Sequence, residues 1–182
     1  MRHGRPRFDV LGQLGSLRRY ARALTRDDGE AEELVHDALV RAYEKRSSFK
    51  PDRNLRNWLL AILHNVFIDR VRSRRSELER NARAVEMADT VVEPDQDHAV
   101  RLAQVRNNFM ALPEEQRAAL HLVAVEGLAY ADAAATLGIP VGTLMSRLGR
   151  ARAALRAMEE NPSRRASSDG RLRVVGGEND AH

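Results

Sequence analysis

The sequence contains no cysteine among its 182 residues. This absence excludes disulfide bonds, thiolate zinc sites and direct sensing of redox state by a thiol. The six histidines are scattered, and none forms an HExxH motif or another pair of metal ligands at helical spacing. We therefore expect neither a metal site nor a cofactor.

Long hydrophobic runs are absent as well. The longest, such as residues 59–63, contain five or six apolar residues, whereas a transmembrane helix needs about 20. The basic N-terminus is not followed by an apolar segment of signal-peptide length. We expect a soluble protein of the cytoplasm. No nucleophile–base pair or phosphate-binding glycine loop is recognisable, so the sequence does not suggest an enzyme.

Strand signals are missing too, which predicts an all-α fold without a sheet. In the N-terminal half, apolar residues recur at helical spacing over residues 8–25, 27–46 and 54–75. Acidic residues open the second of these segments, where they suit the positive end of the helix dipole. We expect the three helices to form one small domain over residues 8–75.

Charge is arranged in blocks, although the net charge is only +4. Residues 50–75 carry seven cationic and two acidic side chains, and residues 76–98 carry seven acidic and two cationic ones. The acidic block lacks sustained periodicity, so we predict a flexible linker over residues 76–98. A second helical domain of four helices is predicted over residues 99–158, and one of these helices is expected to run from Pro113 to Gly127. Residues 159–182 are predicted to be a disordered tail.

The most informative stretch is YADAAATLGIPVGTLMSRLGRARAALRA, residues 130–157. Its small residues let two helix backbones approach closely, and Gly138 suits a left-handed turn. Pro140 then fits the first turn of another helix, where its missing N–H costs nothing. The pattern predicts a helix-turn-helix, which places its second helix in the DNA major groove. An ordinary amphipathic helical hairpin is the alternative.

The second helix of this motif has two distinct faces. Its apolar stripe consists of Leu144, Leu148, Ala151 and Leu155. At about 100° per residue, Thr143, Ser146 and Arg150 point away from the stripe, while Arg147 lies on its flank. Residues 141–157 contain four arginines and no acidic residue. A cationic helix with a clean apolar stripe behind it suits a polyanion such as DNA.

Four segments carry a resemblance to a known family. They are AEELVHDALVRAY at 31–43, NWLLAILHNVFIDRVR at 57–72, ALPEEQRAAL at 111–120 and GLAYADAAATLGIPVGTLMSRLGRARAAL at 127–155. Together they resemble bacterial RNA polymerase sigma factors of the extracytoplasmic-function type, which is group IV of the sigma-70 family. Such proteins have two folded domains, called regions 2 and 4. The resemblance implies that the first predicted domain is region 2 and the second is region 4.

The resemblance also implies a function in starting transcription rather than in catalysis. The protein would bind core RNA polymerase and direct it to promoters. Region 4 would read the −35 element as duplex DNA through the second helix of the helix-turn-helix. The candidate residues for this contact are Thr143, Ser146, Arg147 and Arg150.

Region 2 would hold the −10 element as an unpaired strand. Single-strand binding combines cations along the backbone with pockets or aromatic platforms for bases, and the amide of Asn65 can both donate to and accept from a base edge. The candidates are Asn65, Asp69, Arg70, Arg72, Arg74, Arg75 and Phe49. Two plainer interpretations stay open: Asn65 is an exposed residue without a role, and Phe49 packs on the core near a helix start.

The helix predicted over residues 27–46 would bind a coiled coil of the polymerase clamp. Its outward candidates are Glu32, Glu33, His36, Asp37, Val40 and Arg41. A plain solvated face is the alternative. His36 and Leu39 depart from residues that are common in the family, which should alter the clamp contacts slightly. Met145 and Gly149 also depart from the family pattern and reduce base reading by the second helix of the helix-turn-helix, so we infer no −35 sequence.

The resemblance further implies control by an anti-sigma factor. The acidic linker would be attracted to a basic channel of the polymerase, or would act only as a spacer. Two other functions stay open. One is a sigma-like decoy that binds an anti-sigma factor, and the other is a helix-turn-helix regulator that does not bind core polymerase.

Overall fold

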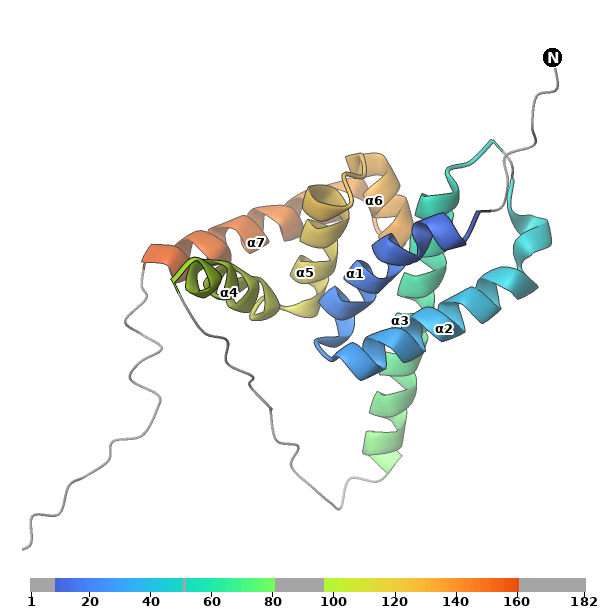
Figure 1. Ribbon diagram of the computed structural model, residues 1–182, viewed down its shortest axis with the longest axis horizontal. Coiled ribbons are helices and arrows are strands. Elements are labelled where there is room, and N and C mark those ends of the chain that lie inside the picture. The colour runs from blue at the N-terminus through green and yellow to red at the C-terminus, as the bar shows by residue number, and fades with distance from the viewer. Residues whose placement is uncertain (1–8, 51, 81–96, 161–182) are drawn as a thin grey trace, which may run out of the picture.

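The computed structural model describes residues 9–50, 52–80 and 97–160, and these residues contain helices and no strand. This confirms the predicted all-α fold (Figure 1). The α-helices are α1 (Leu14–Thr25), α2 (Asp28–Glu44), α3 (Leu55–Arg80), α4 (Asp97–Met110), α5 (Glu114–Leu120), α6 (Tyr130–Leu137) and α7 (Val141–Glu160). Shorter turns are the 3-10 helices η1 (Leu11–Gln13) and η2 (Arg46–Ser48) and the π-helical turn η3 (His121–Val125). Among these helices, none combines the length and the apolar character that crossing a membrane requires.

Local signals set the helix ends in the N-terminal half. Asp27 caps α2, since its carboxylate accepts a hydrogen bond of 2.7 Å from the backbone N–H of Glu30. Asn54 caps α3 in the same way, with a bond of 3.2 Å from the N–H of Asn57. Arg26 closes α1 in the left-handed conformation at φ 64°. Arg26 and Asp27 together turn the chain between α1 and α2.

Helix α3 is longer than the sequence pattern predicts. It continues to Arg80, into the segment expected to be linker. The residues just after position 75 include Glu, Leu and Arg and no Gly or Pro, so helix propensity is high there. Its 26 residues correspond to a length of about 39 Å. The described residues do not include residues 81–96, which are most of the expected linker. They also exclude residues 161–182, which are most of the expected tail.

The C-terminal half departs from the sequence prediction at one turn. A continuous helix was expected from Pro113 to Gly127, whereas α5 gives way to the π-helical turn η3. The N–H of Glu126 donates to the carbonyl of His121, five residues earlier, over 3.0 Å. Gly127 then leaves the helix at φ 67°. The extra residue in this turn changes the direction in which Glu126 points.

The helix-turn-helix has the predicted geometry. Helix α6 ends at Gly138, which adopts the left-handed conformation at φ 65°. Pro140 precedes α7, and its carbonyl accepts the first bond of that helix from Leu144 over 3.1 Å. Leu144, Leu148 and Ala151 are buried, which is the apolar stripe expected for α7.

The two halves of the chain share one hydrophobic core. Figure 1 shows α1 between the α2–α3 pair on one side and α5 on the other, with α6 beside α3, and contacts join α1 to α5 and α3 to α6. A single cluster of buried residues runs through both halves, including Leu17, Leu60, Leu122, Ala133 and Leu144. The sequence predicts two domains and a linker but not this contact between them.

Two buried histidines lie in this core. The Tyr20 hydroxyl lies 3.0 Å from Nδ1 of His64 in α3. The His121 ring stacks on the Tyr20 ring, with 5.3 Å between the ring centroids. Burial lowers the pKa of His64 from 6.5 to about 4, and the nearby Arg147 charge adds to the shift. Burial likewise lowers the pKa of His121 to about 4, against the opposing effect of Glu126. Both rings are therefore neutral in the folded protein at pH 7.

We predict that acid destabilises the fold between pH 6.5 and pH 4. In this window the unfolded chain takes up protons at His64 and His121 that the folded chain does not, so stability is complete above pH 6.5 and falls on acidification. Each histidine should account for roughly 1 to 2 kcal/mol of the loss. Urea unfolding at pH 7 and pH 5 measures it.

The matched variants are His64→Gln, which keeps a hydrogen-bonding group beside Tyr20, and His36→Gln on the exposed face of α2. His64→Gln should lose less stability between the two pH values than the parent chain, and His36→Gln should behave like the parent. An equal loss of stability between pH 7 and pH 5 in all three proteins would show that protonation of His64 does not cause the loss.

Candidate nucleic-acid interface

Helix α7 exposes three of its four predicted DNA-contacting residues. Thr143, Ser146 and Arg150 lie on the solvent face, opposite the buried leucine stripe. The Ser146 hydroxyl donates to the carbonyl of Gly142 over 3.1 Å, which leaves its oxygen able to accept hydrogen bonds. The three side chains form a short polar strip along the first half of the helix. This is the part of a recognition helix that contacts base edges.

Arg147 behaves differently from its neighbours on α7. Its side chain is only 20% exposed and forms a 2.9 Å ion pair with Glu115 of α5. It also lies close enough to His64 of α3 to help lower the pKa of that ring. The flank position predicted from the helix angles therefore places Arg147 toward α5 and α3 in this conformation.

Helix α3 exposes another set of predicted residues. Asn65, Asp69 and Arg72 are exposed and recur at i, i+4 and i+7, so they form a stripe along one face. Arg75 is exposed in the same half of the helix. An amide, a carboxylate and cationic groups thus lie together on the exposed surface of α3.

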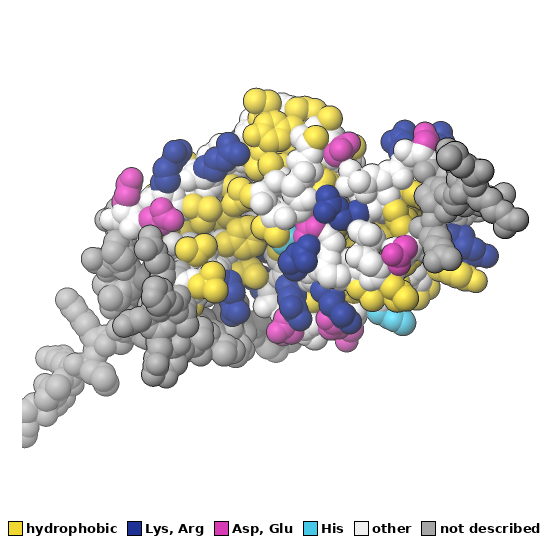
Figure 2. Space-filling view, turned by 45° about the horizontal axis from the view of Figure 1, so that its top comes forward, with side chains coloured by type: hydrophobic (Ala, Val, Ile, Leu, Met, Phe, Trp, Pro, Cys, Tyr) yellow, Lys and Arg dark blue, Asp and Glu magenta, His cyan; other side chains and the backbone are white. Residues whose placement is uncertain are grey.

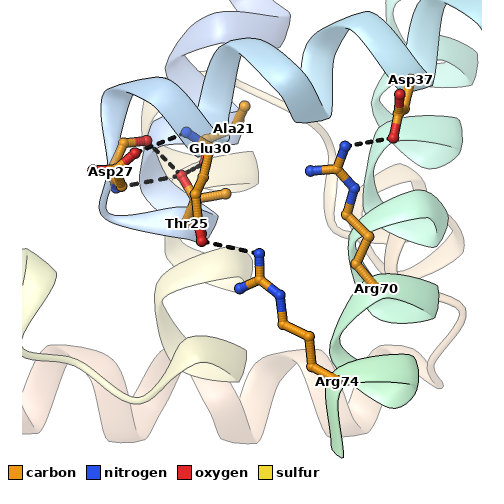
Figure 3. A network of polar contacts seen from close by, with 7 residues as sticks. All are labelled: Ala21, Thr25, Asp27, Glu30, Asp37, Arg70 and Arg74. Carbon is orange, nitrogen blue, oxygen red and sulfur yellow. Dashed lines mark hydrogen bonds and ion pairs between the residues drawn. The ribbon is translucent and has the colours of Figure 1, made fainter. Parts of the chain in front are cut away.

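Arg70 and Arg74 point to α2 instead (Figure 3). The Arg70 guanidinium pairs with the Asp37 carboxylate, and that of Arg74 lies 2.9 Å from the Glu30 carboxylate. Arg70 is 25% exposed and Arg74 is 60% exposed. Both cations are therefore partly neutralised by acids of α2, one of which, Asp37, is a candidate for polymerase contact. Pairs of this kind contribute little to stability but fix where the side chains lie.

Phe49 packs on the protein. Its ring centroid is 5.2 Å from that of Trp58, with the rings tilted by 55°, and Phe49 is half-buried. Trp58 in turn packs against the edge of the core. Of the two interpretations that the sequence leaves open, the packed aromatic is the arrangement that this structure has.

The predicted polymerase face of α2 is open to solvent. All six of its candidates are exposed, and they are Glu32, Glu33, His36, Asp37, Val40 and Arg41. Val40, with 47% of its surface exposed, gives this charged face an apolar centre. A shallow groove between α2 and α3 borders it, lined by residues that include Val40, Arg41, Val66 and Asp69.

Sequence reasoning missed a group of polar residues where the two halves meet. Glu126 and Arg117 are buried, at 3% and 2% exposure, and both contact the N-terminal half. The only sequence signal was an acid followed by a glycine within the apolar run LVAVEGLAY. On the face in Figure 2, basic side chains stand beside acidic ones and do not merge into one basic patch. No group of metal-ligating side chains occurs in the described ranges.

Comparison with known proteins identifies both halves. The family model of sigma-70 region 2 matches residues 13–77, and that of sigma-70 region 4 matches residues 103–155. The ECF RNA polymerase sigma factor EcfG of Rhodopseudomonas palustris is 39% identical over 152 residues, which cover 84% of this chain and 83% of the relative.

Solved structures agree with this assignment. The sigma factor RpoE of Bartonella quintana, crystallised with the anti-sigma factor NepR, superposes with a TM-score of 0.72 at 34% identity, covering 84% of this chain and 94% of that one. CnrH in complex with the cytosolic domain of CnrY superposes with a TM-score of 0.61 at 28% identity, covering 85% and 86%. The chain therefore belongs to the extracytoplasmic-function sigma factors of the sigma-70 family, which are transcription initiation factors and not enzymes.

Proposed function

We propose that this protein is an alternative sigma factor that brings core RNA polymerase to its own set of promoters from the cytoplasm. In this proposal α7 reads the −35 element as duplex, α3 holds the −10 element as a single strand, and α2 binds the polymerase clamp. The observation that supports it best is that the exposed polar strips of α7 and α3 lie on the two segments that match the region 4 and region 2 models.

Direct readout of the −35 element is assigned to Thr143, Ser146 and Arg150. A guanidinium can donate two bonds to guanine, and hydroxyl groups contact several bases. Arg147 joins them only if it leaves Glu115, because that ion pair uses its guanidinium here.

Contact with the unpaired −10 strand is assigned to Asn65, Asp69, Arg72 and Arg75. An extruded base loses its stacking partners, so the protein has to supply hydrogen bonds to its edge and cations for the adjacent phosphates. Arg70 and Arg74 lie nearer to α2, and we assign them first to orienting α2 and α3.

We also propose that an anti-sigma factor controls the protein. The RpoE relative was crystallised with an anti-sigma factor, and this chain covers 94% of its length. The chain has no cysteine, and its described residues contain no group of metal ligands, so a signal is more readily sensed by a partner protein.

Transcription with purified components tests the proposal. The protein is mixed with bacterial core RNA polymerase and fragments of its own genome, and transcript starts are mapped. Discrete starts that core polymerase alone does not give would establish the sigma activity. DNA binding without starts or a stable core complex would favour the regulator, and binding to neither would favour the decoy.

We predict that Arg150→Ala weakens transcription from the mapped promoters by about fivefold or more, because one bidentate base contact is worth about 1 to 3 kcal/mol. Arg156→Ala, which removes an exposed arginine further along α7, is the matched control. Binding of core polymerase should be unchanged in both variants. Equal promoter strength in Arg150→Ala and the parent would show that this face of α7 does not read DNA.

We predict that Arg72→Gln reduces promoter opening more than Arg70→Gln does. Arg72 is exposed, whereas Arg70 pairs with Asp37. Permanganate reactivity of unpaired thymines, measured over a range of salt concentrations, gives the strength and the salt dependence of opening. Removing a phosphate contact should lower the salt slope by about 1. A larger change for Arg70→Gln would reverse the assignment of these two arginines.

A further inference from the structure

A buried carboxylate joins the two regions of this sigma factor. The side chain of Glu126, from region 4, has no exposed surface. In region 2, the Ser16 hydroxyl donates to it, and the Arg19 guanidinium lies 3.1 Å away. Arg56 approaches to 4.0 Å, and His121 lies at 3.4 Å. The π-helical turn η3 makes this possible, since it directs Glu126 out of the helix toward α1.

A buried guanidinium makes a second contact between the two regions nearby. Arg117 of α5 donates to the carbonyls of Ala23 and Leu24, at the C-terminal end of α1. These carbonyls have no partner within α1, because the last four of any helix are left over. Arg117 also donates to the carbonyl of Leu112 over 2.6 Å, and Arg26 of region 2 bonds the same oxygen over 3.3 Å. Region 4 thus completes the hydrogen bonding of a region 2 helix.

This arrangement holds the two candidate DNA-binding helices near each other, with α6 packed against both α3 and α7. Arg147 of α7 lies close to His64 of α3, and the next residue along α3 is Asn65, a candidate for the −10 strand. Promoter elements at −35 and −10 are centred about 25 base pairs apart, which is about 85 Å along B-DNA. The whole of α3 is only about 39 Å long. In this conformation the chain cannot contact both elements at once.

We propose that these two contacts form an interdomain latch that holds the free sigma factor closed without any partner. The latch consists of Ser16, Arg19, Arg56, Arg117 and Glu126. The latch must open before both promoter elements are bound. This inference rests on the proposed function, because it concerns how the same two DNA-binding surfaces become available together.

The charges of the latch make the closed state sensitive to the removal of its exposed arginines. In the closed state the Glu126 side chain is shielded from solvent, so Arg19 and Arg56 have to offset its charge. Those two arginines are 54% and 36% exposed, so replacing them disturbs the fold of region 2 little. Their loss leaves an uncompensated buried charge, which is strongly unfavourable. Opening brings the carboxylate back to water, so the balance shifts to the open state.

The absence of cysteine allows a clean measurement of closure. Asp52→Cys before α3 and Ala135→Cys on α6 place fluorescent labels on exposed positions of elements that pack together. Single-molecule energy transfer then reports closed and open populations of the full chain. The parent should be mainly closed, and Arg19→Met with Arg56→Met should raise the ratio of open to closed by about tenfold or more.

Two further variants separate the latch from a general loss of packing. Adding Glu126→Gln to the double variant removes the unpaired charge, so it should restore closure at least in part. Arg18→Met is the matched control, because Arg18 is also half exposed but pairs with Glu32 within region 2. An extended parent chain, no response in the double variant, or further opening on adding Glu126→Gln would each overturn the proposal.

Core polymerase and a mapped promoter are then added to the labelled chain. The proposal expects energy transfer to fall as the promoter complex forms. Persistent closure in a complex that starts transcription would overturn the latch. If the free chain closes and responds to the variants but never supports transcription, the proposed function fails while the latch stands.

Discussion

Burial of α1 from two sides is the constraint on which the rest of the structure depends. Half of its twelve residues are buried, and they include Leu17, Tyr20 and Leu24. Helices α2 and α3 cover one side, and α5 covers another. A helix of this length is not stable alone in water, so it owes its order to packing on both sides. The regions named 2 and 4 are therefore parts of one folded body in this conformation.

The features that the sequence predicted are the ones decided by near neighbours. Asp27 and Gly138 act within one turn of themselves, so the start of α2 and the helix-turn-helix could be located. The contact of Glu126 with Arg19 joins positions more than a hundred residues apart. No periodicity or spacing encodes such a contact, because each segment alone is an ordinary amphipathic helix. The π-helical turn was not predicted for the same reason, since its effect is to bring Glu126 to residues of α1 that are distant in the sequence.

Counting charges along the chain overstated how much positive charge faces DNA. The basic block at residues 50–75 included Arg56, Arg70 and Arg74, and each of these lies near an acid from another element. Arg72 is exposed and stays a candidate for contact with DNA. The candidate surface on α3 is consequently a narrow stripe in which position on the helix matters more than the number of arginines.

The π-helical turn also has a consequence for comparing relatives. A π turn is an α-helix that has gained one residue, so deleting one residue between His121 and Val125 would restore a regular helix and rotate the residues after it by about 100°. The carboxylate of Glu126 would then leave the interface. The length of this short segment therefore decides whether a carboxylate at this position can reach α1, in this chain and in any relative that shares its fold.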